Sequence, residues 1–477
     1  MKTETLLFAL ILLGGCGDAA EEPVDEGTAP PATYEFASRF EDTSSVAYSG
    51  QTARQVLIDD LNTYMGGLTA AIDNQSFTPT DEGQVVGALD FYFRFDSDSN
   101  GAESLLLTTE PATEQSTHAE ISTEKNLVGK LAGNDAVTDH RDWSSEFSGW
   151  SDTDIAAHGG SISTPEGLLT AWFETVEANA IAHANGDIRT VDGTPLPVTV
   201  TEQGHDLQQL IQKLLTGAVA FSQGTDDYLD DDVDGKGLRS PNTREEDKPY
   251  TALEHAWDEG FGYFGAARDY ASYSDDELAG KGGREAWQGY HDTDGDGAID
   301  LKSEFNFGAS TNAAKRDRGS QDEARTDFTK DAFDAFVAGR HLIANAGEAL
   351  TDEEFAALQG FRDRIVAAWE GALAATVVHY INELLGDMEL FGTAEYDFLA
   401  HAKHWSELKG FALAFQFNPR SPLSKDAFGM LHANVGDAPA LADGGDAEID
   451  AYRTRLLSAR SLLQDAYGFD PSNVEGW

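Results

Sequence analysis

The sequence predicts an all-α fold with long Asp- and Gly-rich loops and at most a short hairpin. Apolar residues recur at three- and four-residue spacing along most of the chain, and strand-type alternation is scarce outside residues 186–203. Thr164 followed by Pro165 is the clearest start signal for a helix. Helices are expected over 50–72, 165–184, 205–221, 327–346, 351–386, 393–415 and about 446–466. The long loops are 96–103, 224–247 and 271–320, and such loops usually carry function.

The start of the chain predicts export and a lipid anchor. The apolar run from Leu6 to Leu13 has the length of a signal-peptide core and is far shorter than the roughly 20 residues of a spanning helix. Leu-Gly-Gly-Cys at 13–16 is similar to the bacterial lipobox, and Cys16 is the only cysteine. An ordinary secretory peptide with an incidental cysteine is the alternative. We expect a signal peptide over 1–15, a lipidated disordered tether over 16–33 and a folded domain over 34–477.

The charge balance excludes whole classes of partner. The chain has 84 acidic and 32 basic residues, a formal net charge of -52, so it repels nucleic acid and anionic lipid. Membrane contact is therefore expected through the lipid on Cys16 only, and Gly17 in place of Asp favours the outer membrane. With that thiol lipidated, disulfides, thiolate catalysis and Cys-ligated zinc are excluded. Solubility in salt-rich water and binding of hard cations both agree with the acidity.

The segment DTDGDGAID, residues 292–300, has the ligand spacing of a calcium loop of the EF-hand class. Alternate carboxylates can wrap one ion, Gly297 permits the tight turn, and Ile299 can anchor the loop to the core. The closing Glu of the class stands twelfth, where this chain has Ser303, so the loop closes differently or binds more weakly. The predicted calcium ligands are Asp292, Asp294, Asp296, Ala298 through its carbonyl, Asp300 and Glu304.

Two other acidic segments are weaker candidates. Residues 226–235 are dense in acids without a fixed ligand spacing, and we expect a charged surface loop there. Residues 96–103 predict a second calcium site, although a polar turn has the same composition. Its ligands would be Asp96, Asp98, Asn100 and Glu103.

Three helical turns pair histidine with acid at three- or four-residue spacing. The turns could hold one transition metal, such as iron or zinc, if their helices pack together, or they could only brace helices. Neither HExxH, GxSxG nor a P-loop is present. The pairs are His255 with Asp258 and Glu259, His379 with Glu383, and His404 with Glu407.

A faint repeat links two of these turns. Trp257 and Glu259 in one match Trp405 and Glu407 in the other, and each is followed by Gly-Phe. The match fits two related bundles, about 34–270 and 321–477, joined by the calcium-loop segment 271–320. Between them lies a rare basic cluster, Lys315, Arg316 and Arg318, which we expect to neutralise neighbouring carboxylates.

The turn HAWDE, residues 255–259, resembles the GxHxxE motif of imelysin-like bacterial envelope lipoproteins. His255 stands for the motif histidine and Asp258 for its acid, while Leu253 replaces the Gly. A closer resemblance, over most of 34–470, is to a sister family catalogued as a domain of unknown function. It rests on 44–55, 255–265, 296–308 and 404–419.

The resemblance implies paired helical bundles and a setting near iron- or metal-uptake systems. We therefore expect a non-catalytic envelope lipoprotein that binds a metal or small ligand, with an uptake receptor as a further partner and calcium as a structural ion. A metal-dependent hydrolase or peptidase with Glu259 or Glu407 as general base, and a partner-binding surface protein, are the alternatives.

Overall fold

The computed structural model describes residues 29–135, 140–151 and 162–477, and the expectations for Cys16, the signal peptide and most of the tether lie outside them. Residues 31–477 form one compact unit. The all-α prediction is confirmed: helices dominate, and the sheet in the described residues is the antiparallel pair β1 (Thr190–Val191) and β2 (Thr194–Pro195). This pair lies inside the segment where the sequence allows a hairpin.

The helices longer than eight residues are α1 (Ser49–Asp73), α2 (Gln84–Phe93), α6 (Pro165–Ala184), α7 (Leu207–Leu215), α8 (Ala252–Phe264), α10 (Gly308–Gly319), α11 (Phe328–Asn345), α12 (Asp352–Glu389), α13 (Phe398–Ala414), α14 (Lys425–Val435) and α15 (Asp446–Tyr467). Short helices are α3 (Ser97–Asn100), α4 (His118–Ile121), α5 (Trp143–Glu146), α9 (Asp275–Leu278) and α16 (Pro471–Gly476). Two π-helical segments, η3 (Thr216–Phe221) and η4 (Gly224–Tyr228), continue the path of α7. No helix in the described ranges combines the length and apolarity that crossing a membrane requires.

The helix starts follow from capping. Thr164 accepts a hydrogen bond from the Gly167 backbone N–H (3.0 Å) with Pro165 at the first turn, as the sequence predicts. Thr351 and Glu354 form a capping box at the start of α12. These side chains satisfy backbone donors that the first turn leaves unpaired.

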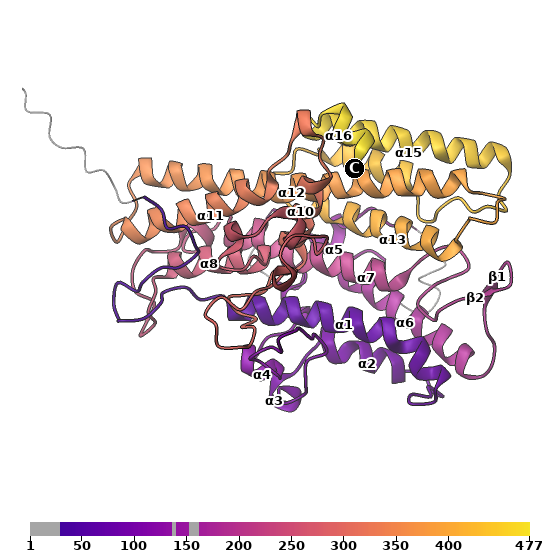
Figure 1. Ribbon diagram of the computed structural model, residues 1–477, viewed down its shortest axis with the longest axis horizontal. Coiled ribbons are helices and arrows are strands. Elements are labelled where there is room, and N and C mark those ends of the chain that lie inside the picture. Colours follow the sequence, from indigo (N-terminus) through magenta and orange to yellow (C-terminus); the bar gives the residue numbers. More distant parts are fainter. Residues whose placement is uncertain (1–28, 136–139, 152–161) are drawn as a thin grey trace, which may run out of the picture. The chain divides into compact units, whose positions relative to one another are not determined.

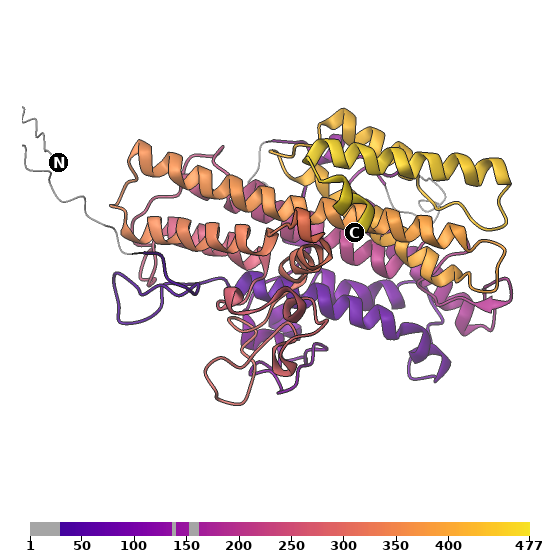
Figure 2. The same cartoon turned by 45° about the horizontal axis from the view of Figure 1, so that its top comes forward.

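The long helix α12 organises the packing. It lies against α11, α13 and α15, while α7 and α8 lie between that layer and α1 (Figure 1; Figure 2). The four largest fully buried side chains, Trp172, Trp257, Trp369 and Trp405, share one continuous hydrophobic core. Helices from the two predicted halves thus pack directly on each other, α7 on α13 and α8 on α11. That the two halves are separate, related helical bundles stays a prediction.

Candidate functional site

The loop predicted to bind calcium brings three carboxylates together. Ligand oxygens of Asp292, Asp294 and Asp296 all lie within 4.8 Å of one another. The Asp292 carboxylate also accepts hydrogen bonds from the backbone N–H groups of Gly295 (2.6 Å) and Gly297 (3.0 Å), which draw the loop around it. Gly297 has φ of 92°, a backbone conformation that a residue with a Cβ rarely adopts. The arrangement can hold a hard cation through oxygen ligands.

The loop is fixed to the fold on its far side. Ile299 is fully buried, its N–H donates to Ala112 O (3.0 Å), and its carbonyl accepts from Glu114 N–H (3.0 Å). Glu304 is buried too, and its carboxylate accepts from the N–H groups of Thr293 (2.6 Å) and Asp300 (2.8 Å). Glu304 therefore ties the start of the loop to its end.

The remaining predicted ligands, Asp300 and Ala298, form hydrogen bonds to neighbouring residues. The Asp300 carboxylate accepts from Gln115 Nε2 (2.9 Å) and Ser303 Oγ (2.7 Å). The Ala298 backbone N–H donates to Asp296 Oδ1 (2.9 Å). Of the predicted side-chain ligands, Asp292, Asp294 and Asp296 are therefore the three whose carboxylates meet in one place.

The second calcium candidate forms the short helix α3. Asp96 caps it, because its carboxylate accepts from Asp98 N–H (3.1 Å) and Ser99 Oγ (2.8 Å), and the Ser99 bond leads in lowering the pKa of Asp96. Within the described chain, Asp98 and Glu103 belong to no group of three ligand side chains that meet within 4.8 Å. Helix capping accounts for this acid without an ion.

The side chains of His255 and Asp258, in the histidine turn on α8, bond to neighbouring segments of the protein. His255 Nδ1 lies 3.1 Å from Ala47 O, and its Nε2 is 3.8 Å from a carboxylate oxygen of Glu259. The carboxylate of Asp258 is fully buried and accepts from Arg340 Nε (2.8 Å) and Tyr34 OH (2.8 Å). Asp258, a predicted site residue, is thus one half of a buried ion pair.

The other two turns meet between α12 and α13. His404 Nδ1 is 2.8 Å from Asp387 Oδ2; this hydrogen bond raises the pKa of His404, and the charges of Glu383 and Glu407 add to the effect. His379 Nδ1 lies 4.0 Å from a Glu383 oxygen. Burial, followed by repulsion from Arg316 and His404, lowers the pKa of His379 to about 4. These four predicted residues therefore share one electrostatic environment.

Glu407 is the buried acid of this group. Its carboxylate is buried, 3.6 Å from Lys213 Nζ, and it hydrogen bonds to Tyr380. The α8 turn does not join this group, because α8 packs against α1 and α11 while α13 packs against α7 and α12. In the ranges the structure describes, no three histidine or acid side chains at these turns meet within 4.8 Å. The turns do not form a preassembled metal centre.

The acidic segment 226–235 was predicted to be a charged surface loop, and this prediction is wrong for part of it. Asp226, Asp227 and Asp230 are buried, because η4 carries this part of the chain into the core. His140 Nδ1 lies 2.8 Å from Asp226 Oδ1, and His140 groups with Asp230 and Asp232 within 4.8 Å. The sequence carries no local signal for this cluster, because the histidine is distant in the chain and the acids have no ligand spacing.

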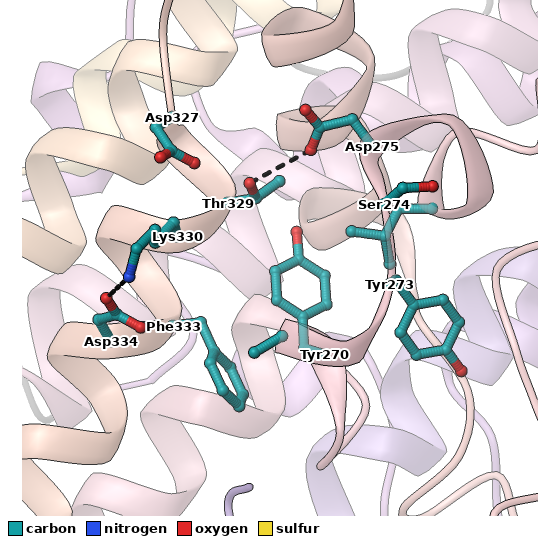
Figure 3. Close-up of a pocket in the computed structure, with 11 residues that line it drawn as sticks. Tyr270, Tyr273, Ser274, Asp275, Asp327, Thr329, Lys330, Phe333 and Asp334 are labelled. Carbon is teal, nitrogen blue, oxygen red and sulfur yellow. Dashed lines mark hydrogen bonds and ion pairs between the residues drawn. The ribbon is translucent and has the colours of Figure 1, made fainter. Parts of the chain in front are cut away.

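A cavity of about 390 Å³ opens between α9 and the start of α11 (Figure 3). Thr329 Oγ1 lies 3.4 Å from Asp275 Oδ1, and Lys330 pairs with Asp334. Burial, with repulsion from Asp317 and Asp327, raises the pKa of Asp275 to about 6. The sequence pointed to no residue of this cavity.

The fold and these sites define an acidic, all-α protein in which three alternate aspartates meet on one loop. Residues 31–424 match the family described as Domain of unknown function (DUF4856), and the chain belongs to that family. No curated protein and no solved structure matches the chain.

Proposed function

We propose that the chain is a calcium-stabilised envelope lipoprotein, anchored through Cys16, that binds a metal ion or small ligand without catalysing a reaction. The observation that carries the calcium part is the meeting of Asp292, Asp294 and Asp296 within 4.8 Å on a loop anchored by Ile299. Pairs of carboxylates at this separation repel by about 1 kcal/mol in water-like surroundings. A divalent cation between them turns that repulsion into attraction.

The envelope setting rests on the lipobox and on the resemblance to imelysin-like lipoproteins, whose relation to this chain is part of the proposal. The ligand site is proposed between α12 and α13, since His379, Glu383, His404 and Glu407 influence one another there. Iron or zinc is the metal in this proposal, and an uptake receptor is the partner. Metal analysis of a His379→Ala/His404→Ala protein tests the metal: content equal to wild type would refute it.

Thermal unfolding with and without chelator tests the calcium loop. Calcium should raise the midpoint of the wild-type chain and leave the midpoint of Asp294→Asn/Asp296→Asn unchanged, because two of three convergent carboxylates are neutralised. Asp98→Asn on α3 is the matched control and should respond like wild type. A wild-type midpoint indifferent to chelator contradicts the proposal.

A further inference from the structure

Arg316 on α10 is a buried cation without a carboxylate partner. The residue is 8% exposed, and its Nε atom is buried with no hydrogen-bond partner. Among the described residues, no carboxylate oxygen lies within 4.0 Å of its guanidinium. The expectation that the basic cluster neutralises neighbouring carboxylates holds for Arg318, which pairs with Asp276, and is wrong for Arg316 and Lys315.

The missing partner is unusual in this chain. Acidic residues outnumber basic ones 84 to 32, so a carboxylate is readily available. The other buried arginines all have acceptors: Arg340 pairs with Asp258 and Glu254, and Arg362 pairs with Asp231. Arg54 has no carboxylate partner, but its guanidinium donates to the backbone carbonyls of Asn126 (2.9 Å) and Gly50 (3.2 Å). A buried guanidinium without such a partner keeps its desolvation cost uncompensated. Burial accordingly lowers the pKa of Arg316 to about 10.

Two lysines bring further positive charge to the same place. Lys213 on α7 has a side chain only 14% exposed, and Lys315 precedes Arg316 on α10. Lys213 and Arg316 are near enough that their repulsion, after partial desolvation, lowers the pKa of Lys315. α10 packs against α12, and α7 packs against α13, which brings these cations beside Tyr380 and Glu407. We call this place the cation junction, defined by Lys213, Lys315, Arg316, Tyr380 and Glu407.

Two of the three acids around the junction, Glu407 and Asp387, lie beside a cation or a histidine whose pKa is raised. Glu407 is 3.6 Å from Lys213 and bonds to Tyr380, and Asp387 is 2.8 Å from His404. Glu383 is exposed and lies 4.0 Å from His379, but the pKa of about 4 leaves that histidine uncharged, so Glu383 balances only one of the three junction cations and Glu407 a second. The junction therefore has an excess of positive charge. Arg316, which carries part of it, is buried, and Lys315 is exposed to solvent.

We propose that the cation junction binds a small oxyanion, a phosphate or a carboxylate, with the Arg316 guanidinium as its main anchor. A guanidinium offers two parallel N–H donors to such a group, and the two lysines add point charges. The repulsive field of the acidic chain disfavours anions elsewhere, so a local surplus of cations gives selectivity. In this inference the oxyanion is the small ligand of the proposed binding role and is held beside the proposed metal residues between α12 and α13. It rests on that binding role and does not depend on the calcium loop.

Calorimetric titration and thermal unfolding of the mature chain, without added calcium, test it, with inorganic phosphate and succinate as separate probes at constant ionic strength. At least one probe should bind saturably and raise the midpoint, and the stronger of the two identifies the source as inorganic or organic. Arg316→Met should weaken binding by about tenfold or more, equivalent to about 1.4 kcal/mol. Without anion its midpoint should equal or exceed that of wild type, because an uncompensated charge has been removed.

Arg318→Met is the matched control: it removes the same charge from the same helix, but from a paired and half-exposed residue, and should keep wild-type affinity. Failure of both probes to bind wild type at about 10 mM would overturn the inference. So would an Arg316→Met chain with wild-type affinity, or one that is markedly destabilised without anion. If Arg316→Met does not fold, exposed Lys315→Ala must weaken binding several-fold, and unchanged affinity refutes the inference.

The two proposals fail separately. Metal binding at His379 and His404 without any anion response would refute the oxyanion and leave the proposed function standing. An anion response in a chain that ignores chelator would refute the calcium loop alone.

Discussion

Replacing Asp258 by alanine tests whether this buried acid of α8 is structural. The substitution removes the acceptor of two buried donors, Arg340 Nε (2.8 Å) and Tyr34 OH (2.8 Å), and of the part-buried Ala47 N–H (3.0 Å). Breaking one side of a buried ion pair costs about 3–5 kcal/mol. Because Arg340 keeps Glu254 at 3.0 Å, we expect the lower end, about 3 kcal/mol, in the free energy of unfolding.

Urea unfolding followed by circular dichroism measures this loss. Glu259→Gln is the control on the same helix, since its side chain is 20% exposed and accepts from Gln51 Nε2 (2.8 Å). It should change the free energy of unfolding by less than about 1 kcal/mol. An Asp258→Ala chain within about 1 kcal/mol of wild type that loses bound metal would refute the structural account and favour a ligand role.

Two further predictions concern stability. Burial raises the pKa of Asp227 to about 7, so the folded state holds this proton more tightly than the unfolded state, and stability falls as pH rises from about 4 to about 7. Asp227→Asn should therefore gain more over wild type at pH 8 than at pH 5 in urea unfolding, and an equal gain at both would contradict this. Gly339→Ala places a Cβ 2.1 Å from the Trp257 ring and should cost about 1–3 kcal/mol, whereas Gly360→Ala, in open space on α12, should stabilise by up to about 1 kcal/mol. Thermal melting curves of Gly339→Ala and Gly360→Ala test this prediction, and equal shifts of the two midpoints from wild type would refute the packing argument.

Local sequence signals predicted the parts of the fold that depend on neighbours in the chain. The helix 165–184 matches α6 from end to end, because periodicity and the Thr164 cap both act within a few residues. The spacing of Asp292, Asp294 and Asp296 likewise predicted that their carboxylates meet, since a tight loop with Gly297 leaves them few other arrangements.

The rest depended on packing between distant segments. The expected helix 205–221 ends as α-helix at Leu215 and continues as the π-helix η3, where Gly217 lies against Ala414 of α13. The grouping of His140 with Asp230 and the isolation of Arg316 from carboxylates also arise from contacts between remote segments. No spacing rule along a single helix encodes such contacts.

Elemental analysis of the mature chain, purified without chelators, tests the central claim about the loop 292–300 most directly. We predict about one calcium ion per wild-type chain, lost in Asp294→Asn/Asp296→Asn and kept in Asp98→Asn. Wild-type protein that is free of calcium and takes up none on titration would contradict it.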